Sequence, residues 1–385
     1  MYKQKRLTPT VCPARCGAVF MTFLFTSLFA LTANAQGQLT TPHSGGNRKA
    51  SVTELLGLTK LELTYNRPGV RGREGKIWGT NVVHYGLRNQ GFGSSKAAPW
   101  RAGANENTTF STSTDVSIEG RKLAAGRYGI FMIAGGTETT VIFSKNSGSW
   151  GSFFYDSTED ALRVNVKNDL LPAPVEWLKY EFIRQTDTSV TVALMWEKRM
   201  IPFTISADIH HVQLASFKQE LRTEPGFIWQ SYEQAAAYCL MHNVELQQGL
   251  AWAEESISGV VGQKNFRTLN TKAALLAKLN KATEAEQIMK EAIPLGNLNE
   301  LHEYAKSLLK QNKNKAAFDV FTLNYRNHPD QLTTNIGLAR GYAAMGNFKM
   351  ALTYMRLALK QVPNEASAAI IRDLIKKLEA GQAIN

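Results

Sequence analysis

The stretch Lys60–Tyr65 (KLELTY) decides how the first half of the chain folds. Leu61, Leu63 and Tyr65 alternate with polar residues, and a period of two is typical of a half-buried β-strand. The same alternation recurs further along the chain: Val116/Ile118, Val141/Phe143, Leu162/Val164/Val166, Leu178/Tyr180/Phe182 and Val190/Val192/Leu194/Trp196. Turn-forming pairs and triplets separate these segments: Arg67-Pro68-Gly69, Glu119-Gly120, Ala125-Gly126, Gly135-Gly136 and Ser147-Gly148. Many short strands at such spacing predict an antiparallel β-sandwich or open barrel over residues 51–206.

After residue 207 the apolar period becomes that of helices, and an internal repeat appears. Alanines and prolines recur about every 34 residues: Ala251, Ala285, Ala317 and Ala351, with Pro329 and Pro363. One interval, from Ala285 to Ala317, is shortened to 32 residues. The pattern resembles a tetratricopeptide array, in which small residues let paired helices approach closely. We expect residues 207–385 to form about four such repeats, closed by a helix over Ser367–Leu378; a plain helical bundle is the alternative.

The N-terminus has the pattern of a secretory signal peptide. Lys3, Lys5 and Arg6 precede an apolar run over residues 18–32, and small residues at Ala33 and Ala35 favour cleavage after residue 35. We therefore expect residues 1–35 to be a signal peptide, residues 36–50 a flexible linker, and the mature protein to be periplasmic or secreted. A retained N-terminal anchor is the alternative.

Charge and cysteine content narrow the possible functions. The net charge of +12 includes four basic and no acidic residues before position 36, which leaves +8 afterwards. The lysines and arginines are dispersed, so we expect no nucleic-acid partner and interpret the charge as mostly solvated surface. Cys239 is the one cysteine after residue 35, which excludes an intramolecular disulfide in the mature chain.

The run Trp100–Thr109 (WRAGANENTT) gathers an indole, a guanidinium, an amide and a carboxylate. Such groups are costly to bury unless they pair with one another, which indicates an organised polar site. We expect the ligand-binding residues to be Arg67, Trp78, His84, Trp100, Arg101, Asn105 and Glu106. In this interpretation Arg101 and Glu106 supply charge, Asn105 an amide, and Trp78 and Trp100, with Tyr85, aromatic surfaces for stacking. The alternative is a structural loop with an Arg101–Glu106 pair and the tryptophans in the core.

The β half resembles the exported bacterial family called domain of unknown function 2911. The matching stretches are residues 63–73, Ile77-Trp78-Gly79, Trp100–Thr109, Leu123–Tyr128, Leu162-Arg163-Val164 and Glu176-Trp177-Leu178. The resemblance implies an exported, β-rich domain and carries no catalytic residues. The chain departs from the family pattern at Leu87–Pro99, a Gly/Ser/Asn-containing insertion between Tyr85-Gly86 and Trp100. This insertion lengthens a loop beside the proposed site and argues against a tight His84–Trp100 arrangement.

Two functions of different kinds follow. The first is a non-catalytic binding or scaffold protein whose helical repeats bind a protein or peptide and whose β domain binds a small polar or glycan ligand. Aromatic faces with amides and charges suit a sugar, which offers apolar ring faces and a rim of hydroxyls. The alternative is a periplasmic glycan hydrolase that uses Glu106 with Arg101 and Asn105, and a third possibility makes the β half a spacer.

No cofactor or metal site is predicted. His84 stands alone in the β half, and the adjacent His210 and His211 point apart if their segment is extended, so we expect them on the surface. We find no phosphate loop, dinucleotide fingerprint or nucleophile elbow. Catalytic residues are therefore not assigned, and the prediction leans against an enzyme.

Overall fold

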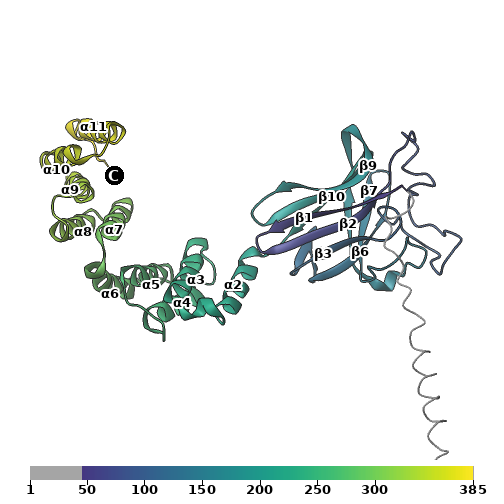
Figure 1. Ribbon diagram of the computed structural model, residues 1–385, viewed down its shortest axis with the longest axis horizontal. Coiled ribbons are helices and arrows are strands. Elements are labelled where there is room, and N and C mark those ends of the chain that lie inside the picture. Colours follow the sequence, from purple (N-terminus) through teal and green to yellow (C-terminus); the bar gives the residue numbers. More distant parts are fainter. Residues whose placement is uncertain (1–45, 385) are drawn as a thin grey trace, which may run out of the picture.

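The computed structural model describes residues 46–384, which form a β domain followed by a curved run of helices (Figure 1). The predicted signal peptide, residues 1–35, lies outside the described residues, as does most of the linker predicted at 36–50. At the described end of that linker, residues 48–50 form the start of the first strand and are not a flexible segment. None of the helices in the described part of the chain is long and apolar enough to cross a membrane.

The β domain consists of two antiparallel sheets, as the alternating pattern predicts. One sheet has the order β1-β2-β3-β6-β7-β8 and the other β5-β4-β10-β9. The strands are β1 (Arg48–Leu56), β2 (Thr59–Arg67), β3 (Thr108–Thr112), β4 (Val116–Ile118), β5 (Arg121–Leu123), β6 (Gly126–Ile133), β7 (Glu138–Ser144), β8 (Asp160–Lys167), β9 (Asp169–Gln185) and β10 (Ser189–Ser206).

The core of the sandwich lies between the two sheets and is built from the predicted alternation. Leu61 and Leu63 of β2 face Leu194 and Trp196 of β10 across this core, and all four are almost fully buried. Since successive strand residues point to opposite faces, the neighbours Lys60, Glu62 and Thr64 of β2 lie at its outer face and are exposed or half-buried. In β10 the alternate residues Ala193 and Met195 are buried as well, in a separate small cluster.

Strand β6 was not predicted, because it does not alternate. Residues from Tyr128 to Met132 are all buried, since both faces of this strand are covered. Its second face packs Phe131 against Ile142 and Tyr155, and Tyr155 belongs to the loop after β7. A strand buried on both sides has a continuous apolar run, for which periodicity gives no signal.

The helical part contains α2 to α11 in the described residues, arranged mainly as antiparallel pairs. The helices are α2 (Ile209–Glu220), α3 (Trp229–His242), α4 (Leu246–Ser258), α5 (Phe266–Lys278), α6 (Ala282–Ala292), α7 (Leu298–Lys310), α8 (Asn314–Asn327), α9 (Leu332–Ala344), α10 (Phe348–Gln361) and α11 (Glu365–Glu379). The pairs are α3–α4, α5–α6, α7–α8 and α9–α10, and α11 packs against α10. Asn265 and Asn297 begin α5 and α7 with capping boxes, which satisfy backbone N–H groups left free at a helix start.

The predicted repeat is present, with one change of register. Ala285, Ala317 and Ala351 are buried in the second helix of their pairs, as expected. In the first pair, however, Ala251 is exposed, and the fourth residue of α4, which corresponds to Ala285 in α6, is the buried Gly249. Gly249 packs closely on Cys239 of α3, since a Cβ there would lie 2.6 Å from the Cys239 Cβ. Burial raises the pKa of the Cys239 thiol to about 11.

The two parts of the chain are joined without a flexible connection. Strand β10 ends at Ser206 and α2 begins at Ile209, with the Asp208 side chain accepting from the His211 N–H at the helix start. Ile209 packs against the β-domain core, while His210 contacts the Tyr238 hydroxyl of α3 through Nδ1 at 2.8 Å. The predicted extended segment is thus helical: His211 is exposed, as expected, but His210 is half-buried.

Acidification should destabilise the helical part through His302. This side chain on α7 packs on Phe321, its buried Nδ1 has no partner among the described residues, and burial lowers its pKa to about 4. The same histidine in the unfolded chain has a pKa near 6.5, so between pH 6.5 and 4 the unfolded state binds a proton that the folded state does not. The free energy of unfolding therefore falls as the pH falls through this range. We expect His302→Leu to remove on the order of 2 kcal/mol of this loss.

The measurement is the urea-unfolding free energy of both proteins at about pH 7 and about pH 5. Other histidines and carboxylates contribute equally to both proteins, so the difference between the two pH dependences isolates His302. Identical losses in the wild type and the variant would contradict this assignment.

Candidate functional site

The loop that begins at Trp100 is fixed to both sheets of the β domain. Trp100 and Met132 of β6 exchange two backbone hydrogen bonds of 2.8 Å. The Trp100 ring, 5% exposed, stacks on Trp196 of the opposite sheet at 6.3 Å between centroids and meets Trp78 edge-on at 5.6 Å. Trp100 therefore belongs chiefly to the core and does not offer the open stacking surface that we expected.

The next residues of the loop are held by buried hydroxyl groups. The carbonyl oxygen of Ala102 accepts from the Tyr180 hydroxyl at 2.9 Å and from Thr108 Oγ1 at 3.0 Å. Burial raises the pKa of Tyr180, which keeps this hydroxyl a donor. A Cβ at Gly103 would lie 2.6 Å from Thr108 Oγ1, so the glycine of the motif is required by close packing.

Asn105 joins this loop to a second loop, residues 149–155. Its backbone is left-handed, with φ of 58°, and its carbonyl oxygen accepts from Gly151 N–H at 3.0 Å and from Arg101 Nη1 at 3.3 Å. Its side-chain Oδ1 accepts from Asn47 Nδ2 at 3.4 Å. Asn105 thus orders the loop and also lines the cavity beside it.

The second loop carries the aromatic residues nearest to Arg101. The Arg101 guanidinium lies 5.3 Å from the Trp150 ring and 5.4 Å from the Phe153 ring, and these two rings are nearly parallel. Trp150 is 61% exposed. The loop is held at its end by Tyr155, whose hydroxyl donates to Asp160 Oδ2 at 2.7 Å.

A cavity of about 650 Å³ opens beside these two loops. Of the seven predicted ligand-binding residues, His84, Trp100, Arg101 and Asn105 line it. His84 and Trp100 thus share the cavity despite the insertion between them. Residues of the insertion join its wall, and Gln90 Nε2 donates to Ser152 Oγ at 2.8 Å.

The other three predicted residues are not among the described residues lining the cavity. Arg67 Nε donates to the Leu178 carbonyl oxygen at 3.0 Å and thereby links β2 to β9. Trp78 is covered by Arg199, whose guanidinium lies 4.6 Å from the indole. Glu106 Oε2 accepts from Asn66 Nδ2 at 2.5 Å, which places this carboxylate against β2. Tyr85, also considered for stacking, is engaged by the same Arg199 through its hydroxyl at 2.9 Å.

Sequence reasoning missed most of the basic residues of the cavity. Arg71, Arg73 and Arg88 line it together with Arg101. Arg71 and Arg73 lie in the Arg-Pro-Gly-Val-Arg-Gly-Arg stretch after β2, where the arginine density was a usable signal. Arg88 comes from the insertion, and no local pattern connects it to the other three. Basic residues that are far apart in the sequence therefore lie together around this cavity.

Burial changes the acid–base properties of two cavity residues. It lowers the pKa of His84, so the ring is neutral at neutral pH, and it also lowers the pKa of Arg101. His84 Nδ1 lies 3.1 Å from the Gly86 carbonyl oxygen and donates to it. The second ring nitrogen, Nε2, is then a buried acceptor, and it has no partner among the described residues. Within residues 46–384, no three His, Cys, Asp or Glu side chains gather so as to hold a metal ion.

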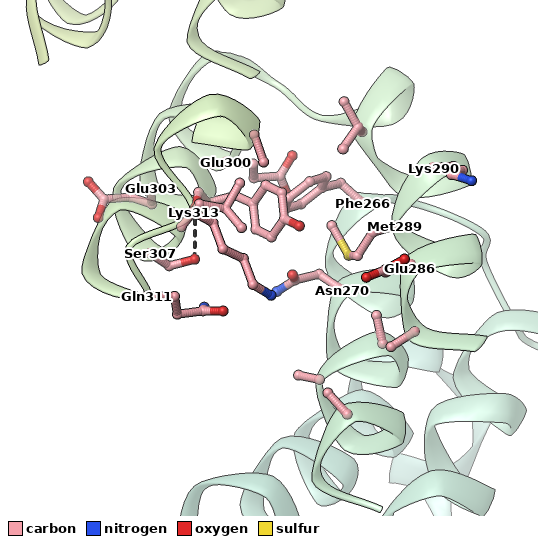
Figure 2. A pocket seen from close by; sticks show the side chains of 18 of the residues that line it. Phe266, Asn270, Glu286, Met289, Lys290, Glu300, Glu303, Ser307, Gln311 and Lys313 are labelled. Carbon is pink, nitrogen blue, oxygen red and sulfur yellow. Dashed lines mark hydrogen bonds between the residues drawn. The ribbon is translucent and has the colours of Figure 1, made fainter. Parts of the chain in front are cut away.

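A second concave surface lies in the helical part, between the α5–α6 and α7–α8 pairs (Figure 2). We call it the helical groove; its cavity volume is about 960 Å³. Its apolar lining residues are Phe266, Ala273, Ala274, Ala277, Ala282, Ala285, Met289, Ile293, Tyr304, Leu308 and Ala316. Its polar lining residues are Arg267, Asn270, Glu286, Lys290, Asn299, Glu300, Glu303, Ser307, Gln311 and Lys313. Asn270 and Lys313 project into the groove from opposite sides (Figure 2).

Gly151 provides a test of how the two β-domain loops are held together. Its φ is +73°, and a Cβ there would lie 2.9 Å from the Arg101 guanidinium carbon. Gly151→Ala should lower the free energy of unfolding by about 2 kcal/mol, because backbone strain and the contact with Arg101 add. The matched control is Gly148→Ala, since no atom lies within 4 Å of a Cβ there. Urea unfolding followed by tryptophan fluorescence measures both, and equal stabilities would contradict the assigned loop contact.

Comparisons with known proteins match the β domain to a family and find solved structures of low similarity. Residues 47–205 match the model of the family described as "Protein of unknown function (DUF2911)". Among solved structures, the chain is similar to YrrB, "a TPR protein with an unusual peptide-binding site", at 16% identity over 42% of this chain and 81% of that one, with a TM-score of 0.29. It is also similar to MamA from Desulfovibrio magneticus RS-1, at 16% identity over 40% and 90% of the two chains, with a TM-score of 0.28.

The comparison with curated proteins found no match. Scores as low as those of the two structures add nothing to the fold that the helix pairs themselves establish. The family match, in contrast, covers the strands and both loops of the β-domain cavity. The match confirms the resemblance carried by the Trp100–Thr109 motif: residues 47–205 are similar to the family described as a protein of unknown function.

Proposed function

We propose that the protein is a non-catalytic scaffold whose helical groove binds an extended peptide segment of a partner protein. The observation that carries this proposal is the helical groove itself, an open cavity of about 960 Å³ with an apolar floor and a polar rim. The α5–α6 and α7–α8 pairs meet through Phe266 and Tyr304, whose ring centroids lie 6.0 Å apart, and the open surface between the pairs is suited to a long, narrow ligand.

The chemistry of the groove fits a peptide in particular. The small alanines of α5 and α6 leave room for side chains, and Met289 adapts its shape to different apolar groups. Asn270, Asn299 and Gln311 supply amides on the rim. An amide both donates and accepts, which matches the alternating N–H and C=O groups of an extended backbone.

The charges of the groove favour a peptide of mixed charge. Three carboxylates, those of Glu286, Glu300 and Glu303, line the groove. Three basic residues line it as well: Arg267, Lys290 and Lys313. Arg267 is already paired with the buried Glu233 of α3, so its charge is largely compensated within the protein. A strongly acidic or strongly basic ligand therefore gains little here.

A second function, the binding of a small polar ligand in the β-domain cavity, is supported by the meeting of His84, Arg101 and Asn105 in one enclosed wall. Cavities of several hundred Å³ are of the size that takes small molecules. Hydrolysis through Glu106 is not part of this proposal, since the Asn66 side-chain amide donates to this carboxylate and places it against β2. Export of the protein remains a prediction from residues 1–35.

Removing the rim amides should weaken peptide binding without disturbing the fold. We expect the double variant Asn270→Ala/Gln311→Ala to lower the affinity for a groove peptide about tenfold, because bound backbone groups lose their partners. The probe is a peptide selected from a random linear phage library on the full chain, and fluorescence anisotropy measures its affinity.

The matched control is Asn327→Ala/Gln382→Ala, which changes the same two residue types at exposed positions outside the groove lining. This control should bind the selected peptide as the wild type does. The proposal fails if selection enriches no peptide, or if the groove variant binds the enriched peptides as tightly as the control.

A further inference from the structure

We propose that the β-domain cavity binds an acidic sugar, a saccharide that carries carboxylate or phosphate groups. This inference rests on the function proposed above for that cavity and names the chemical class of its ligand. Three features carry it: the excess of positive charge, the amides in the wall, and the exposed aromatic surface at its edge.

The described wall of the cavity contains four arginines and no aspartate or glutamate. Within residues 46–384 their guanidinium groups donate to neutral oxygens: the carbonyl oxygens of Gly46, Gly69, Val70 and Asn105, and the amide oxygen of Asn81. A carboxylate, that of Glu176, accepts from the backbone N–H of Arg71 at 3.0 Å. Gathering four like charges is unfavourable unless an anion offsets them. A guanidinium group binds carboxylate or phosphate through two parallel hydrogen bonds, which makes these the matching ligand groups.

The arginines are held in place before a ligand arrives. Arg73 is half-buried and donates through Nε and Nη2 to the carbonyl oxygens of Val70 and Gly69, at 2.9 and 2.8 Å. Arg101 is half-buried beside two aromatic rings. Arg71 and Arg88 are exposed and remain reachable from solvent. Arg71 and Arg88 are also held, through hydrogen bonds to the Gly46 carbonyl oxygen and to Asn81 Oδ1. Side chains that are already ordered lose little entropy when an anionic ligand binds.

Hydroxyl groups on the ligand would find partners in the same wall. The wall contains the amides of Asn89 and Gln90 from the insertion, besides Asn105. Asn89 is exposed and Gln90 half-buried, so a sugar hydroxyl can reach these amides, which both donate and accept. An inorganic anion alone would make little use of them, so the wall fits a ligand that carries both anionic groups and hydroxyls.

The edge of the cavity offers an aromatic surface. Phe153 lines the cavity, and the neighbouring Trp150 and Phe92 are 61% and 64% exposed. Phe92 comes from the insertion and meets Phe153 edge-on at 5.5 Å between centroids. The C–H faces of a sugar ring pack well on such rings, whereas a small aliphatic diacid has no comparable face. The insertion thus supplies both polar and aromatic groups to this cavity.

Calorimetric titration of the full chain tests the inference with three probes: trigalacturonate, glucose 6-phosphate and the neutral maltotriose. We expect one or both acidic sugars to bind, and maltotriose to bind at least tenfold more weakly. Binding should weaken between about 25 mM and about 300 mM NaCl, since salt screens the arginines. Comparing the two acidic probes distinguishes carboxylate from phosphate as the recognised group.

Two exposed arginines provide the variants, Arg71→Gln and Arg88→Gln, and the matched control is Arg127→Gln, an exposed arginine of β6 outside the cavity lining. Each cavity variant should lower the affinity for the acidic sugar about tenfold while the control stays unchanged. Thermal melting confirms that all three variants fold.

Equal binding of maltotriose and the acidic sugars would overturn the inference but leave the cavity as a site for a neutral polar ligand. Affinities that the cavity variants do not change would place the binding elsewhere and overturn the inference. Binding of citrate or pyrophosphate without any sugar would also overturn it, because the hydroxyl and ring contacts would then be irrelevant. If none of these probes binds, both the inference and the proposed function of this cavity fail, while the helical groove is tested separately.

Discussion

The β domain depends on the position of Trp100. Its backbone closes a two-bond bridge with Met132 in one sheet, and its ring stacks on Trp196 in the other. A single residue thus joins the two sheets at the point where the cavity begins. The loop that follows is therefore anchored at its first residue. Two residues later it is anchored again, because the Tyr180 hydroxyl donates to the Ala102 carbonyl oxygen. The start of the cavity loop is therefore fixed by the packing of the core, because Trp100 belongs to both.

The parts that the sequence predicts well are those governed by local repetition. Leu61 and Leu63 identify a half-buried strand because alternate side chains share a face, and Ala317 and Ala351 identify paired helices because close approach needs small residues. Prediction failed where a neighbouring segment covers a second face, as Tyr155 does over β6. It also failed in the first helix pair, where Gly249 and not Ala251 takes the position of the small interface residue.

The candidate site shows the same division between local and long-range information. The Trp100–Thr109 motif located the cavity because its glycine, amide and guanidinium are close in sequence. Its role was harder to infer, since Arg71 and Arg88 reach the same wall from segments that only the fold brings together. The electrostatic character of a cavity depends on such convergence, and the average charge of a chain gives no measure of it. This is why dispersed arginines became a concentrated positive surface.

The short junction between β10 and α2 has a consequence for binding. Ala207 is buried, Ile209 packs on the sandwich and His210 contacts α3, so the connection contains no freely rotating segment. A partner that carries both a saccharide and a neighbouring peptide would meet two recognition surfaces at a set separation. Engaging the first would raise the effective concentration at the second if the partner's own spacing matches, and would add nothing if it does not. The junction would then favour partners whose two binding groups have the matching separation, in addition to the matching chemistry.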